Sequence, residues 1–464
     1  MSAKVPVVVL GAGPAGLGLA WKLACRGGFE VTVLERNSEP GGNAGSFEWQ
    51  GQRLDYGSHR LHPSCAPGIL ADIRGFLGSD LLDRPRHGRI RLLGRWLHFP
   101  LKPFDLALHA PPSFLTGVLL DKMRPRPTEG AATFATLLEQ GLGQTICREF
   151  YFPYARKIWG LAPEELDAEQ ARRRVSASSL GKIVRKVMSA VPGLKPPGAG
   201  RFFYPRRGYG QISDGYLRAA AGQGVRVFFE TQADGIEREG SRVVALRAGG
   251  ERLPASLVLS TIPVTALARL LDPPSAVLAA AGALRYRAMI LIYLALEADQ
   301  FTGFDAHYFP GGEIAITRLS EPKHYGLAGE AGRTVLCAEL PCSTGDACWS
   351  ATDEDLGALV VECLGRAGLP LRPRVGGIVT RRLPQAYPVY ATGFRADFDR
   401  IDDWLAGLEG LLTLGRQGLF VHDNTHHTLA MAYAAAASVR DDGSLDREQW
   451  ATARSAFESN VVED

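Results

Sequence analysis

The chain has 464 residues, of which 46% are apolar and 22% charged, a composition typical of a folded protein with a large core. At roughly 150 residues per domain, the length predicts more than one domain. The formal net charge is only +3, so we do not expect the strong positive field that attracts nucleic acids.

The seven cysteines are an odd number and include no C-x-x-C pair. They indicate reduced thiols, and the sequence predicts no metal site. The first residues lack the pattern of a secretory signal, and no uncharged apolar run reaches the roughly 18 residues that a membrane-spanning helix needs. We therefore expect a cytoplasmic protein without a transmembrane segment.

A strand, a glycine-rich turn, a helix and a second strand are predicted in succession within residues 6–34. The turn carries Gly11, Gly13 and Gly16 at the spacing G-x-G-x-x-G, which permits a tight turn, close approach of a diphosphate and close packing of the helix. Glu35 follows the second strand, where a carboxylate can accept hydrogen bonds from a ribose. This βαβ unit predicts a dinucleotide-binding domain.

A second glycine cluster follows directly. Beyond Glu35 the chain continues with Arg36 and reaches Gly41, Gly42 and Asn43, where the backbone must again lie close to a cofactor. With this extension the pattern resembles the flavin-binding signature of the superfamily of amine oxidases, protoporphyrinogen oxidases, phytoene desaturases and UDP-galactopyranose mutases. The resemblance implies FAD as the cofactor, with this glycine cluster beside its diphosphate and isoalloxazine.

The next segment is dense in polar and aromatic residues. Gly57 would permit close approach to a ring, and His59 or His62 could donate a hydrogen bond to it or move a proton. A purely structural histidine is the alternative. The spacing resembles a Gly-x-His-x-x-His turn of the mutases, and this implies that His59 contacts the flavin and handles protons.

Residues 80–200 are rich in proline, arginine and apolar residues with helical patches. Within them, Tyr154, Lys157 and Trp159 belong to a motif that resembles one found in the mutases and in a protoporphyrinogen oxidase-like group, and in the mutases this segment lines the substrate cleft. Core packing is the alternative for these rings. Residues 180–191 form a basic amphipathic pattern, which indicates either peripheral membrane contact or a helix packed on its own core.

Strand patterns at 224–229, 236–246 and 255–263 predict a return to the cofactor domain. In the superfamily this succession places a residue near Val227 against the adenine. Strand-like runs alternate with turns over 280–395, which predicts an antiparallel substrate-binding sheet.

Arg318 and Lys323 lie in this sheet region among apolar residues, so both could point into a cleft and meet a carboxylate or a phosphate. The segment resembles a mutase strand whose arginine binds the substrate diphosphate. A salt bridge with Glu321 or Glu339 is the alternative. We predict Arg318 as the anchor of an anionic group and Lys323, with His59, as a catalytic group that handles protons. The candidate substrate contacts are Tyr154, Lys157, Trp159, Arg318, Tyr325 and Tyr387.

Near the C-terminus, Gly415 and Arg416 follow a strand pattern, and Asp423, Asn424 and Thr425 precede an alanine-rich helix. Side-chain oxygens at such a position cap the helix, whose N-terminal amides face an anion or a carbonyl. The arrangement resembles the last FAD motif of the superfamily, which implies cofactor contacts for all five residues.

The predicted fold is α/β, with a discontinuous Rossmann-like FAD-binding domain, an antiparallel-sheet substrate domain and a helical insertion. We expect the cofactor domain at 1–79, 201–279 and 396–464 with a C-terminal helix, the mostly helical insertion and substrate cleft at 80–200, and the sheet domain at 280–395.

The resemblance implies a FAD-dependent oxidoreductase that transfers a hydride from a small organic substrate to the flavin. Two alternatives stay open: a mutase-like, non-redox enzyme acting on a sugar nucleotide, and a non-catalytic flavin-binding protein at a membrane surface. Mutase activity is in question because the turn at 422–427 departs from the bacterial mutases. The segment at 202–211 also resembles the protoporphyrinogen oxidase-like oxidases and the eukaryotic mutases more than the bacterial mutases. A homodimer is compatible with the sequence.

Overall fold

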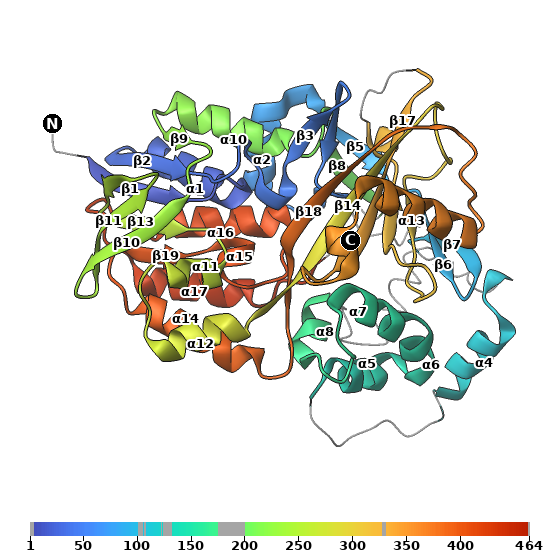
Figure 1. Ribbon diagram of the computed structural model, residues 1–464. Helices are drawn as coiled ribbons and strands as arrows, with labels where there is room; N and C mark the ends of the chain where they lie inside the picture. Colours follow the sequence, from blue (N-terminus) through green and yellow to red (C-terminus); the bar gives the residue numbers. More distant parts are fainter. Residues whose placement is uncertain are drawn as a thin grey trace.

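The computed structural model describes residues 4–100, 105, 108–121, 123, 132–174, 200–326 and 331–462. Its two largest sheets lie side by side, with a group of helices beneath the second one (Figure 1).

The first sheet is parallel throughout and has five strands. Their order is β19 (Leu411–Thr413), β13 (Leu257–Ser260), β1 (Val5–Leu10), β2 (Phe29–Leu34) and β9 (Arg226–Phe228). Strands β1, β2, β13 and β19 are short, apolar and largely buried, as strands of a parallel sheet usually are, whereas β9 at one edge is partly exposed. They come from distant parts of the chain, which confirms the predicted discontinuous Rossmann-like domain.

Helices cover one face of this sheet. They are α1 (Pro14–Arg26), α2 (Pro67–Leu77), α10 (Gln211–Gly222), α16 (Thr425–Ala437) and α17 (Arg447–Phe457). Helices α1 and α16 approach closely, because a Cβ on Gly18 would lie only 2.9 Å from a methyl group of Leu429. This packing brings the starts of α1 and α16 together, although they are over 400 residues apart in sequence.

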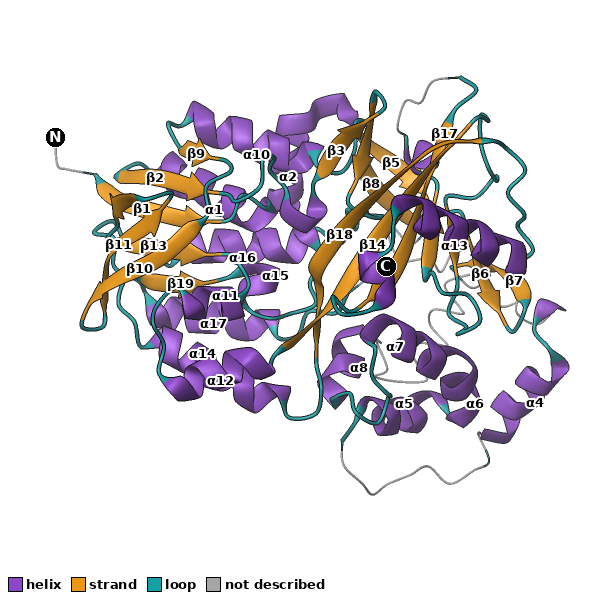
Figure 2. Ribbon diagram, in the orientation of Figure 1, coloured by secondary structure: helices purple, strands orange, loops and turns teal. Residues whose placement is uncertain are grey.

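The other face is covered by a small antiparallel sheet and three helices (Figure 2). The elements are β10 (Ala233–Glu239), β11 (Arg242–Ala248), β12 (Glu251–Pro254), α11 (Val264–Arg269), α12 (Ser275–Ala283) and α14 (Phe394–Ala406). Alternation along β1 divides the core, because Val7 and Val9 pack against α1 and Val8 and Leu10 against this second layer.

The second sheet has seven strands. Their order is β18 (Val375–Val389), β14 (Arg285–Leu296), β17 (Thr334–Cys342), β16 (Arg318–Ser320), β15 (Ala306–Tyr308), β6 (Gly88–Leu92) and β7 (Arg95–Phe99). All neighbours are antiparallel except β15 and β6, so the predicted antiparallel sheet is confirmed. Helix α13 (Asp353–Arg366) packs on one face, and the hairpin of β3 (Ser46–Trp49) and β4 (Gln52–Asp55) on the other.

The insertion is less helical at its start than the sequence indicated. Residues 81–99 form β5 (Leu81–Pro85), β6 and β7, and β5 pairs with β8 (Arg201–Pro205). In β6 the side chains of Ile90 and Leu92 are buried while Arg89 and Arg91 between them are partly exposed. This two-residue period marks a strand, but the arginine-rich composition concealed it.

The remaining described part of the insertion is helical and packs around its own small core. Its elements are α4 (Pro112–Asp121), α5 (Phe134–Leu142), α6 (Gln144–Ile146), the π-helical turn η3 (Cys147–Tyr151), α7 (Phe152–Trp159) and α8 (Ala168–Arg174). The amphipathic pattern at 180–191 lies outside the described residues. None of the helices described combines the length and the apolar character needed to cross a bilayer.

Candidate functional site

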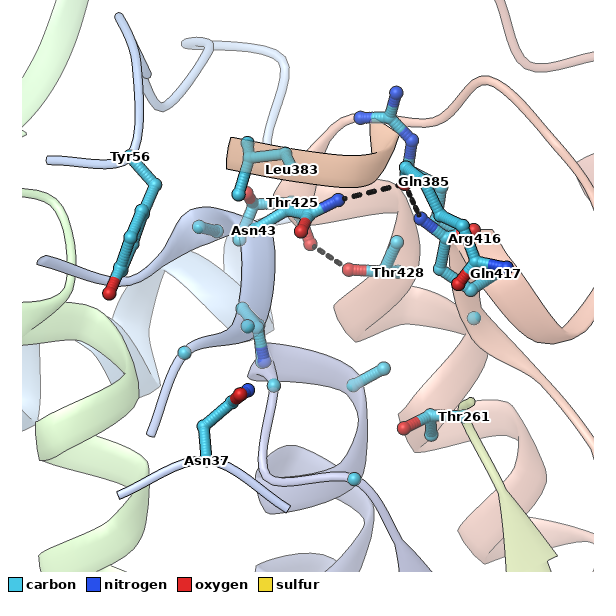
Figure 3. A pocket seen from close by; sticks show the side chains of 18 of the residues that line it. Asn37, Asn43, Tyr56, Thr261, Leu383, Gln385, Arg416, Gln417, Thr425 and Thr428 are labelled. Carbon is cyan, nitrogen blue, oxygen red and sulfur yellow. Dashed lines mark hydrogen bonds between the residues drawn. The ribbon is translucent and has the colours of Figure 1, made fainter. Parts of the chain in front are cut away.

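A cavity of about 830 Å³ opens between the two large sheets. Leu10 and Leu34, which end β1 and β2, line it, as do Thr261 after β13 and Gly415 after β19. It therefore lies beyond the carboxyl ends of the parallel strands, where open α/β sheets bind ligands. Its far wall is the end of β18, seen with Leu383 and Gln385 in Figure 3.

The turn before α1 is built for close approach. Gly11 has φ of +100°, and a Cβ on Gly16 would lie 1.9 Å from the carbonyl oxygen of Gly11, so both must be glycine. Gly13 is the N-cap of α1 and makes no side-chain cap, which leaves the first amides of this 13-residue helix to an anion. Gly13 lines the cavity, whereas Gly16 lies behind it.

The two glycine clusters predicted from sequence lie together. The amide of Gly41 donates to the carbonyl of Ala12 at 2.8 Å, and a Cβ on Gly42 would be 3.9 Å from the Cα of Gly13. Both clusters, with Asn43, line the cavity. The arrangement leaves room for a diphosphate at the start of α1 and fits a dinucleotide.

Glu35 lies at the end of β2 with 6% of its surface exposed. Its Oε2 accepts a hydrogen bond from the amide of Ala12 at 2.9 Å, and its Oε1 accepts from the amide and side chain of Asn37 at 2.9 and 2.8 Å. A carboxylate offers about four acceptor positions, so it can also receive ribose hydroxyls. Arg36 beside it lines the same end of the cavity.

Val227 does not line the cavity. It pairs with Val33 inside the parallel sheet and packs against the helical layer. The residues that reach the cavity instead are Thr231, Gln232 and Ala233, in the loop beyond β9 and at the start of β10. Ligands contact the loops beyond the strand ends, whereas Val227 lies within a strand, so the loop after β9 is the part of this segment that can reach a ligand.

His59 lies in the cavity wall and is partly buried. Its Nε2 lies 2.9 Å from the carbonyl oxygen of Tyr56, and because a carbonyl only accepts, Nε2 carries the proton. Burial lowers the pKa of His59, so the ring is neutral and its Nδ1 is an acceptor. Its ring packs against Tyr209 at 5.3 Å.

The neighbouring predicted residues lie outside the cavity lining. Gly57 has φ of +95°, and a Cβ there would be 3.3 Å from Glu339 Oε1, so this glycine lets the chain pass beside Glu339. His62 is bonded to Ser64 Oγ at 2.7 Å and stacks on His426.

Arg318 lines the cavity but is already paired. Its Nε and Nη2 donate to the same Oε1 of Glu339 at 3.0 and 2.6 Å, which is the salt bridge that the sequence left as an alternative. Burial disfavours the charged guanidinium, but Glu339 outweighs burial and holds the pKa of Arg318 well above its usual value. Arg318 therefore carries a charge that Glu339 largely balances.

Lys323 and Tyr325 do not line the cavity. They lie in the 3-10 turn η4 (Pro322–Tyr325), which breaks the strand alternation that would have put Lys323 beside Arg318. Lys323 Nζ donates to the carbonyl of Arg333 at 2.9 Å. Tyr325 is 1% exposed and its hydroxyl contacts Ser58 Oγ at 2.7 Å.

The three candidates of the aromatic motif in α7 do not line the cavity. Lys157 Nζ donates to the carbonyls of Phe309 and Ile316 and fastens α7 to the second sheet, and burial lowers the pKa of Lys157 to about 8. Tyr154 stacks on Phe150. Trp159 is buried and supports two cavity residues edge-on, at 4.9 Å from His422 and 5.7 Å from Tyr387.

The C-terminal candidates all line the cavity: Gly415, Arg416, Asp423, Asn424 and Thr425. Asn424 caps α16 in a capping box with His427, which fixes the start of that helix at the cavity. Arg416 donates to the carbonyl of Ala386 at 2.9 Å, and Asn43 and Gln417 both donate to the carbonyl of Gln385 (Figure 3).

Several residues of the cavity wall were not predicted from the sequence, among them Tyr56, Arg174 and His422. The first and last adjoin motifs that were recognised, so a wider reading of those motifs would have included them. Arg174 is one of three consecutive arginines at the end of α8 and has no distinguishing spacing.

The comparisons with known proteins agree with this geometry. A family model described as an NAD(P)-binding Rossmann-like domain matches residues 9–73. The chain is 28% identical over 316 residues to coproporphyrinogen III oxidase of Propionibacterium freudenreichii subsp. freudenreichii, a match that covers 58% of this chain and 58% of that relative. The chain thus aligns with little more than half the length of this curated relative.

Two solved structures share the whole fold. One is a reduced UDP-galactopyranose mutase, with a TM-score of 0.76 at 20% identity over 94% of both chains. The other is a putative protoporphyrinogen oxidase from Exiguobacterium sp. 255-15, with a TM-score of 0.72 at 19% identity over 95% of this chain and 99% of that one. The superfamily resemblance predicted from the sequence is confirmed.

Proposed function

We propose that this chain binds FAD and oxidises a small organic substrate. The observation that carries the proposal is the continuity of one cavity, which runs from the glycine turn of α1 to the side chains of the second sheet. A nicotinamide enzyme must admit and release its cofactor, whereas a cavity lined by two glycine clusters and the start of α16 suits a resident cofactor. The name of the matching oxidase relative points the same way.

The residues that would hold FAD come from three chain segments. The α1 turn and Glu35 would bind the diphosphate and ribose, Gly41 and Gly42 would lie along the cofactor, and the start of α16 would face its ring. Bound FAD would supply the acceptor for a hydride. The protein would orient the substrate and keep water out.

His59 has a narrower role than the sequence alone implied. Its only ring proton is committed to the Tyr56 carbonyl, so toward the cavity it offers an acceptor. It can take a proton from a substrate or accept its hydrogen bond. Lys323 lies outside the cavity lining and donates to the carbonyl of Arg333, so we do not include it among the proposed proton-handling groups.

A mutase-like, non-redox reaction is the second candidate, favoured by the fold shared with the solved mutase. Against it, Arg318 is bound to Glu339 and is poorly placed to neutralise a diphosphate. The two candidate reactions need different forms of the enzyme: the oxidation starts from oxidised flavin, whereas the mutase-like reaction needs reduced flavin.

The test is anaerobic absorbance spectroscopy of the FAD-loaded protein. Oxidised protein is mixed separately with a porphyrinogen, with an amine and with UDP-galactose. We expect the porphyrinogen or the amine to bleach the flavin absorbance. Turnover of UDP-galactose by dithionite-reduced protein alone would favour the mutase reaction. Tight FAD without bleaching or turnover by any of them would favour a non-catalytic flavoprotein.

A further inference from the structure

Two cysteines of the second sheet region lie in contact outside the cavity lining. Cys342 is the last residue of β17, and Cys348 follows in the 3-10 turn η5 (Ala347–Ser350). Both side chains belong to the apolar cluster that the second sheet forms with α13. Their thiols hydrogen-bond to each other. The two sulfur atoms are therefore neighbours in the folded protein, as a disulfide requires.

The chain between the two cysteines is folded into a closed turn. The amide of Ser343 donates to Asp346 Oδ2 at 2.6 Å, and the amide of Asp346 donates back to the carbonyl of Ser343 at 3.0 Å. The amide of Trp349 then donates to the carbonyl of Asp346 at 2.9 Å. Because these bonds already bring the ends of the turn together, a disulfide would close a loop that the reduced protein has formed.

The two thiols differ in how they meet solvent. Cys342 is buried, whereas Cys348 is partly exposed, so an oxidant in solution reaches Cys348 first. Burial, and then the neighbouring Cys348, raise the pKa of Cys342 to about 12, while the guanidinium of Arg287 acts in the opposite direction. An exposed thiol beside a buried one is the arrangement of an attacking and a resolving cysteine.

One arginine joins this turn to the cavity. Arg382 lies in β18 and lines the cavity. Its Nε donates to the carbonyl of Trp349 at 2.8 Å, and its Nη2 donates to the carbonyl of Ala351 at 2.5 Å. Both acceptors lie in or directly after η5, the turn that carries Cys348. A change in the shape of η5 therefore moves the groups that hold a side chain of the cavity wall.

We propose that Cys342 and Cys348 are a peroxide-sensitive thiol pair, whose closure into a disulfide alters the cavity wall through Arg382. The Cys348 thiolate attacks one oxygen of hydrogen peroxide, the O–O bond breaks, and a sulfenic acid and hydroxide form. The Cys342 thiolate then attacks the sulfenic sulfur, the S–S bond forms, and the second oxygen leaves as hydroxide. The two thiol protons convert both hydroxides to water. The inference goes beyond the proposed function, because it concerns thiols outside the cavity and does not require FAD.

The test is treatment of the reduced full chain with hydrogen peroxide, followed by alkylation of free thiols and peptide mass spectrometry. We expect a peptide pair joined between Cys342 and Cys348, which dithiothreitol separates again. Cys348→Ser should lose this cross-link. Cys25→Ser is the matched control, because Cys25 is also a solvent-accessible thiol but lies in α1, and its replacement should leave the cross-link unchanged.

Hydrogen–deuterium exchange of the same samples tests the connection to the cavity. Peroxide should change the exchange of residues 347–351 and 380–385 in the wild type and in Cys25→Ser, but not in Cys348→Ser. If Cys348→Ser does not fold, Cys348→Ala removes the same thiol and must also lose the cross-link.

Absence of the Cys342–Cys348 cross-link after peroxide treatment would overturn the inference, as would its persistence in the Cys348 variant. A cross-link with unchanged exchange at 380–385 would overturn the role of Arg382. These measurements are made on FAD-loaded and FAD-free protein. A protein that takes up no FAD refutes the proposed function, whereas the cross-link judges the thiol pair in either form.

Discussion

At some single positions, the space around the residue decides which side chain the fold can accept. Gly16 is the sharpest case, since a Cβ there would lie 1.9 Å from the Gly11 carbonyl oxygen. Gly16→Ala must push α1 away from the turn, so we expect a loss of about 2 kcal/mol or more in unfolding free energy and loss of FAD retention.

Gly75→Ala is the matched control for that variant. Gly75 lies in α2, and a Cβ there would meet no atom within 4 Å. It should stabilise the protein by about 0.5–1 kcal/mol, because glycine within a helix costs that much relative to alanine. Chemical denaturation and bound flavin per chain measure both variants, and retention of flavin by Gly16→Ala would contradict the close packing of the turn.

His307 gives a residue-level prediction about pH. It is 4% exposed in β15, and burial lowers the pKa of His307 to about 4. The unfolded chain, with a pKa near 6.5, binds this proton first as pH falls, so the neutral folded form loses stability between pH 6.5 and 4. At 1.36 kcal/mol per pKa unit, the loss is about 3 kcal/mol.

Substitution of His307 by Gln should therefore flatten the fall in unfolding free energy between pH 6.5 and 4. The comparison is made as the difference between wild type and variant, which should be constant above pH 7 and shrink below pH 6.5. A difference that does not change with pH would show that His307 titrates alike in both states.

At the scale of elements, Asp55 ties the hairpin of β3 and β4 to the rest of the cofactor site. Its carboxylate accepts hydrogen bonds from Ser46 Oγ at 2.6 Å, Tyr204 OH at 2.5 Å and the amide of Tyr209 at 2.7 Å. Asp55→Ala leaves these buried donors unpaired, at a cost of roughly 1–3 kcal/mol for each. We expect a clearly lowered melting temperature and weaker FAD binding, because the hairpin carries Tyr56 and His59 into the cavity.

Asp83→Ala is the control at this scale. Asp83 lies in β5, half exposed, and pairs with Arg201 at the surface. Its loss should change the unfolding free energy by less than about 1 kcal/mol. Equal effects of the two alanine variants would mean that the buried network does not hold the hairpin.

Sequence patterns located the elements better than the side chains within the site. The glycine clusters, Glu35 and the start of α16 were predictable because each follows from local backbone geometry at a strand end or helix start. Val227, Lys323 and Trp159 do not line the cavity. Val227 lies within a strand and not beyond its end, the turn η4 takes Lys323 away, and Trp159 packs against Tyr387 and His422. That Arg174 and Arg416 both lie over the ring of Tyr387 could not be foreseen, because only the fold brings the end of α8 and the turn after β19 together.

At the scale of the whole molecule, the cavity couples the two large sheets, so a ligand that fills it must stabilise both. FAD at 100 times its dissociation constant should raise the unfolding free energy by about 2.7 kcal/mol. ADP can occupy only the end near Glu35 and should give a smaller shift in melting temperature at the same concentration.

NAD serves as the competing dinucleotide, because the family model that matches residues 9–73 is described as NAD(P)-binding. Thermal denaturation of flavin-free protein with each compound ranks them. A shift with NAD equal to or larger than that with FAD would mean that the second glycine cluster and the start of α16 do not serve a flavin.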